Sequence, residues 1–264
     1  MLENKSLTQL KALMADVKDL DDDRLVALRK DPRQGAKKLV QQVEKRIQRQ
    51  AAAYKAYQAR LTYERQVLDQ DPGLLIAGVD EVGRGPIAGP VVAAAVILPC
   101  DTHRWIAVTD SKQISDKTRR QMADLIRQEA VAYAICEISP QIIDQVNIYQ
   151  ASRLAMKGAV DQLSVQPDYL LIDAMTVDLD IPQMAITKGD SKSLSIAAAS
   201  ILAKVYRDDY MIQMVQEYPE YHFDQHMGYP TSVHLQALAK YGQTSIHRQS
   251  FGPVQRTQKN YKPS

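Results

Sequence analysis

The chain has few of the residues that build disulfide or thiolate sites, and it lacks long apolar runs. Its 264 residues include only two cysteines, Cys100 and Cys136, without a CxxC spacing. Neither a disulfide framework nor a thiolate metal site is therefore indicated, and we expect both cysteines to act as small hydrophobic residues. No run of about 18 apolar residues is present, so we expect no membrane-spanning helix.

The N-terminus also lacks the features of a secretory signal. Charged residues occur throughout residues 1–23, and no apolar stretch precedes a small-residue cleavage site. We therefore expect a cytoplasmic protein. A hydrophobic content of 45% and a charged content of 24% are typical of globular domains, and the length suffices for one large domain with an appendage.

The net charge of +2 hides an uneven distribution. Residues 1–70 carry 15 basic and 10 acidic side chains, whereas the remainder of the chain is slightly acidic. Residues 30–65 alone contain ten basic side chains and only three acidic ones. Such a stripe suits a polyanion such as a nucleic acid. The solvated face of a long helix would explain the same charges equally well.

The pattern of apolar residues predicts a helical N-terminal extension over residues 1–70. Apolar positions recur at helical spacing in 6–19, and 33–69 contains no proline and a single glycine. The sequence Asp71-Pro72-Gly73 ends this region, because proline cannot continue a helix and glycine favours a turn. We therefore place a second domain at 71–264.

The second domain alternates strand-like and helix-like segments. The expected strands are 74–80, 90–98, 131–139, 168–173 and 183–187, and the expected helices are 116–129, 141–164, 192–209 and 231–241. About ten residues without a helical pattern join the first two strands, which predicts a hairpin, whereas the later strands alternate with helices. The predicted fold class is α/β, with a mixed sheet flanked by helices.

Carboxylates at the ends of strands are the main chemical signal. Asp80 and Glu81 end the first strand, Asp173 ends the fourth, and Asp190 lies in a turn before an alanine-rich helix. Taken singly, each has an ordinary structural explanation as a salt-bridged strand end, a turn residue or a helix cap. Three acidic ends in one sheet favour a site for a hard cation such as Mg²⁺ or Mn²⁺, because oxygen ligands select such ions.

Other common sites do not fit the observed spacings. Residues 83–89 have a GxGxxxG pattern followed by a strand, whereas a dinucleotide-binding fingerprint needs GxGxxG and a helix. His222 and His226 have the spacing of some zinc ligands, but a nearby proline and glycine leave little room for a helix that would align them. His234 and His247 are isolated in the sequence. No nucleophile-elbow pattern supports covalent catalysis.

Several motifs, taken in order, resemble bacterial ribonuclease HII. They are GVDEVGRGP at 78–86, DSK at 110–112, LIDA at 171–174, KGD at 188–190, AAASILAKV at 197–205, GYPT at 228–231 and IHRQSF at 246–251. The match extends over about residues 73–254, and the ordered set is highly specific. The resemblance implies a ribonuclease H-like mixed sheet flanked by helices, with the helical N-terminal extension and a helical C-terminal segment added.

The resemblance implies an endonuclease that hydrolyses the RNA strand of RNA·DNA hybrids and also cuts at ribonucleotides embedded in duplex DNA. Its products would be a 5′-phosphate and a 3′-hydroxyl. The family's four metal ligands correspond to Asp80, Glu81, Asp173 and Asp190, whose combined charge matches two Mg²⁺ or Mn²⁺ ions. Because consecutive strand residues face opposite sides, Asp80 and Glu81 are expected to share a site only if the strand ends or bulges there.

The resemblance also implies contacts with the substrate. The turn Gly83-Arg84-Gly85 corresponds to the family's contact with the ribonucleotide at the cleavage junction, and Tyr229 corresponds to a tyrosine that packs against its sugar. Glycines suit this role because they let the backbone approach the sugar closely. Three basic residues are candidates for phosphate contacts, although solvation at the surface explains them equally well: Lys112, Lys188 and Lys192.

Two other classes of protein remain possible on this fold. A catalytically silent nucleic-acid-binding protein is disfavoured because all four carboxylate positions are filled. An integrase or resolvase is disfavoured by the Gly83-Arg84-Gly85 turn and by Tyr229. We expect a monomer without membrane contact. We also expect the basic extension to add a non-specific grip on the duplex.

Overall fold

The computed structural model describes residues 5–99, 103–112 and 114–260, and Cys100 lies outside them. By the contacts within the chain, it divides into two compact units, Met1–Gln58 and Ala59–Ser264. The long helix α3 (Gln34–Arg60) begins in the first unit and ends in the second. Each unit has its own buried core.

The first unit is built from α1 (Leu7–Leu13), α2 (Asp23–Arg29) and most of α3. Its core consists of apolar residues at helical spacing, including Leu10, Met14, Leu25, Leu28, Leu39 and Val43. The expected helix over 6–19 is shorter than predicted. The guanidinium of Arg46 donates hydrogen bonds of 2.7 to 2.8 Å to the carbonyls of Met14, Ala15 and Val17. A longer helix would use these carbonyls for its own backbone hydrogen bonds, which accounts for the difference.

The predicted helix over 33–69 is interrupted at Leu61. A short helix, α4 (Thr62–Leu68), follows α3, and its Glu64 is buried in the second unit. Glu64 Oε1 accepts hydrogen bonds from the hydroxyls of Ser193 and Ser195, at 2.6 and 2.7 Å, and from the Ser195 amide at 3.0 Å. These bonds hold α4 against the start of α9 (Leu194–Glu217).

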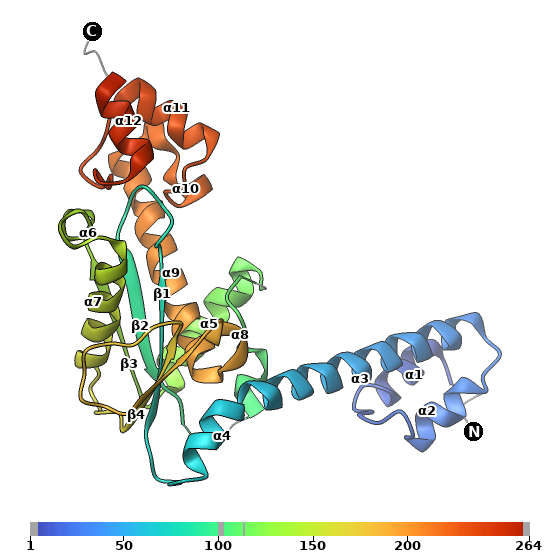
Figure 1. The fold of residues 1–264 in the computed structure, drawn as a ribbon. Coiled ribbons are helices and arrows are strands. Elements are labelled where there is room, and N and C mark those ends of the chain that lie inside the picture. The colour runs from blue at the N-terminus through green and yellow to red at the C-terminus, as the bar shows by residue number, and fades with distance from the viewer. Residues whose placement is uncertain (1–4, 100–102, 113, 261–264) are drawn as a thin grey trace. The chain divides into compact units, whose positions relative to one another are not determined.

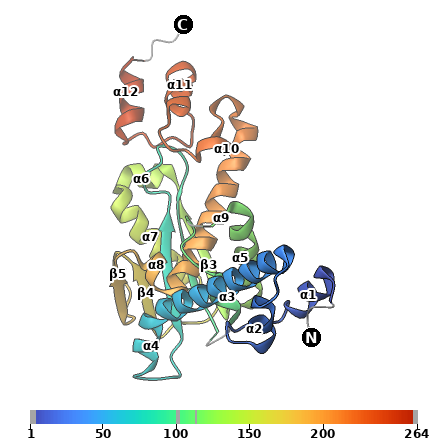
Figure 2. The ribbon, with the colours of Figure 1, turned by 90° about the vertical axis from the view of Figure 1, so that its right-hand side faces the viewer.

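All five expected strands are present in the second unit (Figures 1 and 2). They are β1 (Ile76–Val82), β2 (Val91–Ile97), β3 (Ala132–Ile138), β4 (Tyr169–Asp173) and β5 (Gln183–Ile186). The order in the sheet is β3-β2-β1-β4-β5, with β1, β2 and β3 antiparallel and β1, β4 and β5 parallel. The predicted hairpin and mixed sheet are thus confirmed.

Helices cover both faces of this sheet. α7 (Ile148–Asp161) packs on one face, and α9 packs on the other (Figures 1 and 2). α9 approaches β1 so closely that a Cβ added at Gly78 would lie 2.0 Å from the carbonyl carbon of Ser195. Small residues on both elements, such as Ala77 and Gly78 of β1 and Ala198 and Ala199 of α9, make this approach possible.

One of the expected helices is divided, and another begins later and ends later than expected. The segment 141–164 forms α6 (Pro140–Val146) and α7, separated at Asn147, which has a φ of 71° and caps α7 through its side chain. The expected helix 192–209 corresponds to α9, which begins after the cap residue Ser193 and continues to Glu217, and a separate short helix, α8 (Gly189–Lys192), precedes it. The helix α5 (Asp116–Glu129) has the predicted bounds.

The C-terminal segment is helical, as expected. It contains α10 (Phe223–His226), α11 (Ser232–Tyr241) and α12 (Gly252–Asn260), of which only α11 was predicted individually. Thr231 caps α11, and Gly242 ends it with a φ of 80°. Two short 3-10 helices, at His103–Ala107 and Pro219–Tyr221, complete the described elements. Across the described ranges, no helix is both long enough and apolar enough to cross a membrane.

Candidate metal centre and nucleic-acid interface

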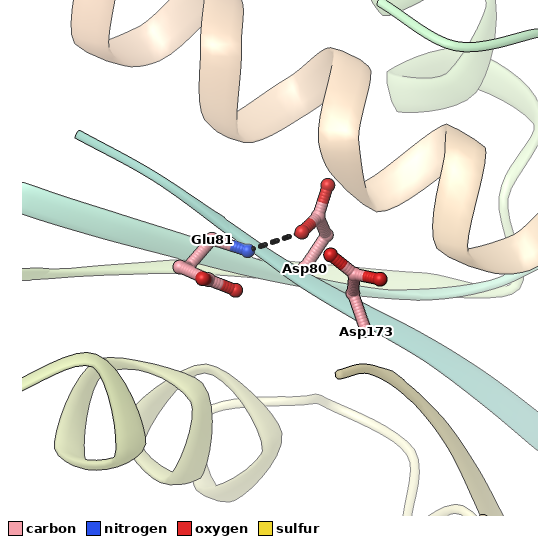
Figure 3. Close-up of side chains that lie close together, drawn as sticks. All are labelled: Asp80, Glu81 and Asp173. Carbon is pink, nitrogen blue, oxygen red and sulfur yellow. Dashed lines mark hydrogen bonds between the residues drawn. The ribbon is translucent and has the colours of Figure 1, made fainter. Parts of the chain in front are cut away.

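Three carboxylates meet where β1 continues past the end of β4. Asp80 and Glu81 belong to β1, and Asp173 is the last residue of β4. One oxygen of each residue lies within 4.8 Å of the others (Figure 3). A group that offers only oxygen ligands suits hard divalent cations such as Mg²⁺ or Mn²⁺. The structure thus brings together three of the four acids singled out in the sequence.

β1 neither bulges nor ends at these two residues, contrary to expectation. Its antiparallel register with β2 continues unbroken through Asp80, Glu81 and Val82. The two side chains leave opposite sides of the strand, with Asp80 on the α9 side (Figure 3). They still reach the same place, because the ladder between β1 and β4 stops at Val79 and Ile172. Beyond that point, β4 no longer pairs with this edge of β1, so both carboxylates can turn toward the space beside it.

Burial makes this crowding of negative charge costly. Asp80 is only 4% exposed, and burial, followed by the charges of Glu81 and Asp173, raises its pKa well above the ordinary value. Burial is also the main cause that raises the pKa of Glu81 and of Asp173. Two unit charges at this spacing repel by roughly 3 kcal/mol at an effective dielectric near 20. A bound divalent cation would offset this repulsion.

One buried oxygen of the group lacks a partner. Oε2 of Glu81 has no hydrogen-bond partner among the described residues, whereas Oε1 pairs with Nη1 of Arg84 at 3.3 Å. In contrast, the Glu81 amide donates to Oδ1 of Asp80 at 2.7 Å, which fixes the direction of that carboxylate. A buried acceptor without a donor is unfavourable unless a cation satisfies it, so the donor set fits a metal centre.

Asp190 lies beside this group but outside it. Oδ2 of Asp190 accepts a 3.1 Å hydrogen bond from Nζ of Lys112. The pKa of Lys112 is raised, because its bond to Asp190 and nearby acidic charges together outweigh the opposing effect of burial. The negative charge of Asp190 in turn contributes to the raised pKa of Asp173, behind burial, so the fourth acid is electrostatically close to the other three.

The turn that follows β1, residues 83–89, is called the glycine turn below. Gly83 has a φ of 92°, and a Cβ there would lie 2.2 Å from Nε of Arg207, so only glycine fits. Arg84 and Gly85 are exposed. A Cβ at Gly85 would lie 3.4 Å from Cε1 of Tyr229, which places the Tyr229 ring beside the turn.

The residues that are candidates for contacts with the substrate are exposed. Lys188 and Lys192 flank Asp190, and both are exposed. Lys112 keeps 74% of its side chain exposed although it is paired with Asp190. Tyr229 is 46% exposed. All of these side chains are therefore accessible to a ligand.

A buried histidine cluster near Tyr229 is not apparent from the motifs. Nε2 of His234 lies 3.0 Å from Nε2 of His247, and the ring of His234 stacks on that of His226 with centroids 4.5 Å apart. His234 and His247, which are isolated in the sequence, are therefore neighbours in three dimensions. His226 bonds the Tyr221 carbonyl and the Gly228 amide through its two ring nitrogens, which leaves none for zinc.

Known structures place the second unit in a common fold class. Ribonuclease H2 from Pyrococcus horikoshii matches with a TM-score of 0.62 and 25% identity, over 70% of this chain and 97% of that chain. Bst-RNase HIII in complex with Mn²⁺ matches with a TM-score of 0.56 and 20% identity, over 71% of this chain and 70% of that one. The fold is therefore ribonuclease H-like, and the acidic group is of the kind that a metal-dependent nuclease requires.

Family models identify the particular family of ribonucleases H. The model described as Ribonuclease HII matches residues 77–254, and the Ribonuclease HII N-terminal domain matches 6–68. Ribonuclease HII of Levilactobacillus brevis is 50% identical over 256 residues, which cover 97% of this chain and 98% of the relative. That of Bacillus subtilis is 46% identical over 251 residues, covering 95% and 97%. The chain belongs to the ribonuclease HII family and is a ribonuclease H. The N-terminal extension, which the sequence motifs did not include, is matched by the family as well.

Proposed function

We propose that this ribonuclease H hydrolyses the RNA strand of RNA·DNA hybrids and cuts at ribonucleotides embedded in duplex DNA, leaving 5′-phosphate and 3′-hydroxyl ends. The observation that carries the proposal is that the glycine turn follows the two acids of β1, Asp80 and Glu81, almost directly. Glu81 and Arg84 are paired across this junction at 3.3 Å. A phosphodiester held at the acids would therefore have its sugar beside the exposed part of the turn.

We propose Asp80, Glu81, Asp173 and Asp190 as ligands of two Mg²⁺ or Mn²⁺ ions. Four carboxylates carry the charge that two such ions balance, and Oε2 of Glu81 lacks any other partner in the described residues. When bound, the ions would activate water and stabilise the leaving 3′-oxygen. Mn²⁺ is bound by Bst-RNase HIII, which shares the fold. The amides of Glu81 and Gly189 would hold Asp80 and Asp173 in fixed orientations while the ligands bind.

Selection of ribose is assigned to the glycine turn and Tyr229. Gly85 leaves the backbone uncovered, and the Tyr229 ring lies next to it. A sugar could pack against this ring while its hydroxyl meets the main chain. A site that hydrogen-bonds a hydroxyl can reject the deoxy analogue by about 10⁴-fold, because buried polar groups are otherwise left without partners.

The exposed lysines would bind the backbone on either side of the cut. Lys188 and Lys192 stand on both sides of Asp190, and Lys112 is paired with it. Their ammonium groups are suited to phosphates as point charges. All the named residues come from one chain, so the proposal requires only a monomer.

The first unit is proposed to add non-specific affinity for the duplex. Some of its arginines act internally, since Arg29 pairs with Glu44 at 2.8 Å and Arg46 binds main-chain carbonyls. The other basic residues of α3 that belong to the first unit lie within about 120° of its circumference, at 100° per residue, opposite its buried positions. They are Lys37, Lys38, Lys45, Arg49 and Lys55, all exposed.

The test uses two duplexes of identical sequence, one all-DNA and one with a single ribonucleotide. The full-length protein is incubated with each in Mg²⁺, in Mn²⁺ or in chelator, and the ends of the products are identified. We expect cutting only of the ribonucleotide duplex and only with metal, with a 3′-hydroxyl on one fragment. Cutting of both duplexes, or of neither, would refute the proposed specificity.

A further inference from the structure

A buried guanidinium lies behind the glycine turn. Arg248 has no exposed surface, and its side chain donates to four main-chain carbonyls of the turn. Nη2 bonds the carbonyl of Gly83 at 2.6 Å, and Nη1 bonds those of Arg84 and Pro86 at 3.2 and 2.8 Å. Nε bonds the carbonyl of Gly89 at 2.9 Å. One side chain therefore sets the direction of four peptide groups.

The main chain around Arg248 holds the turn as well. The Arg248 amide donates to the carbonyl of Ile87 at 2.9 Å, and the Gly89 amide donates to that of Ile246 at 2.8 Å. These bonds surround an isolated antiparallel bridge between Ala88 and His247. The C-terminal segment is thereby fixed to the turn, so the position of the guanidinium is set by the fold.

A second buried arginine supports the far end of the same turn. Arg207 of α9 donates from Nη2 to the carbonyl of Ala88 at 3.1 Å and from Nε to that of Pro90 at 3.0 Å. Its Nη1 bonds the carbonyl of Met227 at 3.0 Å, two residues before Tyr229. Arg207 thus joins the turn to the tyrosine segment, whereas Arg248 reaches the carbonyls of Gly83 and Arg84.

The geometry of the peptide bond gives these contacts a consequence for the ligand. In a trans peptide, the N–H points opposite to the preceding C=O. Because the carbonyls of Gly83 and Arg84 point inward at Arg248, the N–H groups of Arg84 and Gly85 point outward. Both residues are exposed, and neither amide donates to an acceptor within the described residues. Two successive outward N–H groups form a concave site for an oxygen atom.

We propose that Arg248 is a positioning residue for ribose recognition, which orients the peptide groups of Gly83 and Arg84 so that the next two amides meet the ribose 2′-oxygen. This rests on the proposed function, since it requires a ribonucleotide at the turn. Arg248 touches neither substrate nor metal. It acts through the backbone of the turn.

The chemistry of Arg248 favours this role over simple filling of space. Its guanidinium forms no ion pair in the described part of the chain. Its hydrogen-bond partners are neutral carbonyls, and it also lies over the ring of Phe251, 5.1 Å from the centroid. A buried cation without a counter-ion is unfavourable, and apolar residues usually fill such a volume at lower cost. Only the planar fork of arginine can reach four carbonyls at once, because a lysine ammonium is a compact point with three donors.

The first test replaces Arg248 by lysine, which keeps the charge, and by glutamine. Arg256→Lys, at an exposed position of α12, is the matched control. Cleavage of the single-ribonucleotide duplex is measured with Mg²⁺, binding to the all-DNA duplex is measured in chelator, and folding is followed by thermal unfolding. We expect both Arg248 variants to lose about 10²-fold in kcat on the ribonucleotide duplex, as a misplacement near 1 Å does. Binding to all-DNA duplex should be unchanged, and the control should behave as wild type.

The second test does not depend on any variant of Arg248. Wild-type protein labelled with ¹⁵N-glycine has eleven glycines, and the Gly85 amide signal is assigned by its loss in Gly85→Ala. In chelator, the ribonucleotide duplex should shift this signal and the all-DNA duplex should not.

The outcomes separate this proposal from the proposed function. If wild type cuts both duplexes equally, the proposed function fails. If wild type is selective for ribose, the positioning role is overturned by folded Arg248 variants that keep wild-type kcat and selectivity. It is equally overturned by a Gly85 signal that does not respond to the ribonucleotide.

Discussion

The backbone amide of Gly189 donates a 2.6 Å hydrogen bond to Oδ1 of Asp173, which joins the start of α8 to the end of β4. Asp190 follows Gly189 directly, so this bond brings the fourth acid toward the other three. A Cβ at Gly189 would lie 2.6 Å from Cδ1 of Ile196 and 3.3 Å from Oδ1 of Asp173. The arrangement of the acids thus depends on a main-chain contact that a side chain at position 189 would crowd.

Removal of one crowded carboxylate should stabilise the protein in the absence of metal. The pKa of Asp80 is raised in the folded state, so between pH about 4 and that raised pKa the folded protein binds more protons than the unfolded chain. The free energy of unfolding therefore falls as the pH rises through this range. We expect Asp80→Asn to increase the free energy of unfolding by about 1–3 kcal/mol at pH 8 in chelator.

Urea unfolding with chelator and with Mg²⁺ measures this effect. Mg²⁺ should stabilise wild type more than Asp80→Asn, because the variant has one ligand fewer. Asp178→Asn, at an exposed position, serves as the control. An Asp80→Asn variant that is less stable than wild type in chelator would contradict the electrostatic account.

The histidine cluster should make the fold sensitive to acid. Burial lowers the pKa of His234 to about 4 and that of His247 to about 3. Between these values and the ordinary pKa near 6.5, the unfolded chain binds more protons, so stability is lost as the pH falls below about 6.5. Each histidine contributes about 1.4 kcal/mol per pH unit in this range. We expect a loss of about 2 kcal/mol or more between pH 6.5 and 5.5.

Urea unfolding in Mg²⁺ at pH 7.5, 6.5 and 5.5 checks this slope, and the metal limits the opposing contribution of the acids. The exposed His222 provides the control, since His222→Asn should leave the slope unchanged. Equal stability at pH 7.5 and pH 5.5 would show that the cluster does not titrate as described.

Two glycines of the turn should respond differently to alanine. Gly83→Ala places a methyl group against Arg207 at a positive φ, so we expect a loss of about 2–4 kcal/mol in stability. Gly85→Ala meets Tyr229 at an ordinary contact distance of 3.4 Å, so stability should change by less than about 1 kcal/mol. Its methyl group would nevertheless narrow the space for the sugar, and cleavage should fall. Thermal unfolding and cleavage assays distinguish the two effects, and wild-type cleavage by Gly85→Ala would remove the turn from sugar recognition.

The basic face of α3 should contribute to affinity through its charge. We expect the triple variant Lys38→Gln, Lys45→Gln and Arg49→Gln to bind the duplex more weakly, with a salt dependence reduced by up to about 0.9 in slope for each phosphate that is no longer neutralised. Stability and kcat should be unchanged, because these side chains are exposed. Binding titrations from 50 to 200 mM salt, with Lys11→Gln as the control, measure the slope. An unchanged salt dependence of binding would show that the basic residues of α3 are only solvated and do not contact the duplex.

The sheet could be predicted because each strand is predominantly apolar and is bounded by turn residues. β2 is buried at every position, and its sequence Val91–Ile97 consists only of valine, alanine and isoleucine. The division between α6 and α7 could not be predicted, because Asn147 adopts its positive φ without a nearby glycine. The proline before it, Pro140, stands at the start of α6 and does not mark the division. Propensity identifies such segments but not the residue at which packing divides them.

The acids could be predicted from their places at strand ends, whereas their supports could not. Asp80, Glu81 and Asp173 occupy such ends, so the topology of the sheet brings them together. His234 and His247 are 13 residues apart and meet only because the segment after α11 folds back. Arg248 lies in a motif that the family resemblance included, but its four carbonyl partners lie 159 to 165 residues away in the sequence.

The most direct test of the central claim is single-turnover cleavage by Asp173→Asn of a duplex with one ribonucleotide in saturating Mg²⁺, beside Asp178→Asn. The carboxylate of Asp173 is one of the proposed metal ligands, and its loss should remove several kcal/mol of transition-state stabilisation. We predict a rate at least about 10²-fold below wild type, with binding to the duplex retained and with Asp178→Asn unaffected. Wild-type turnover by Asp173→Asn would contradict the account.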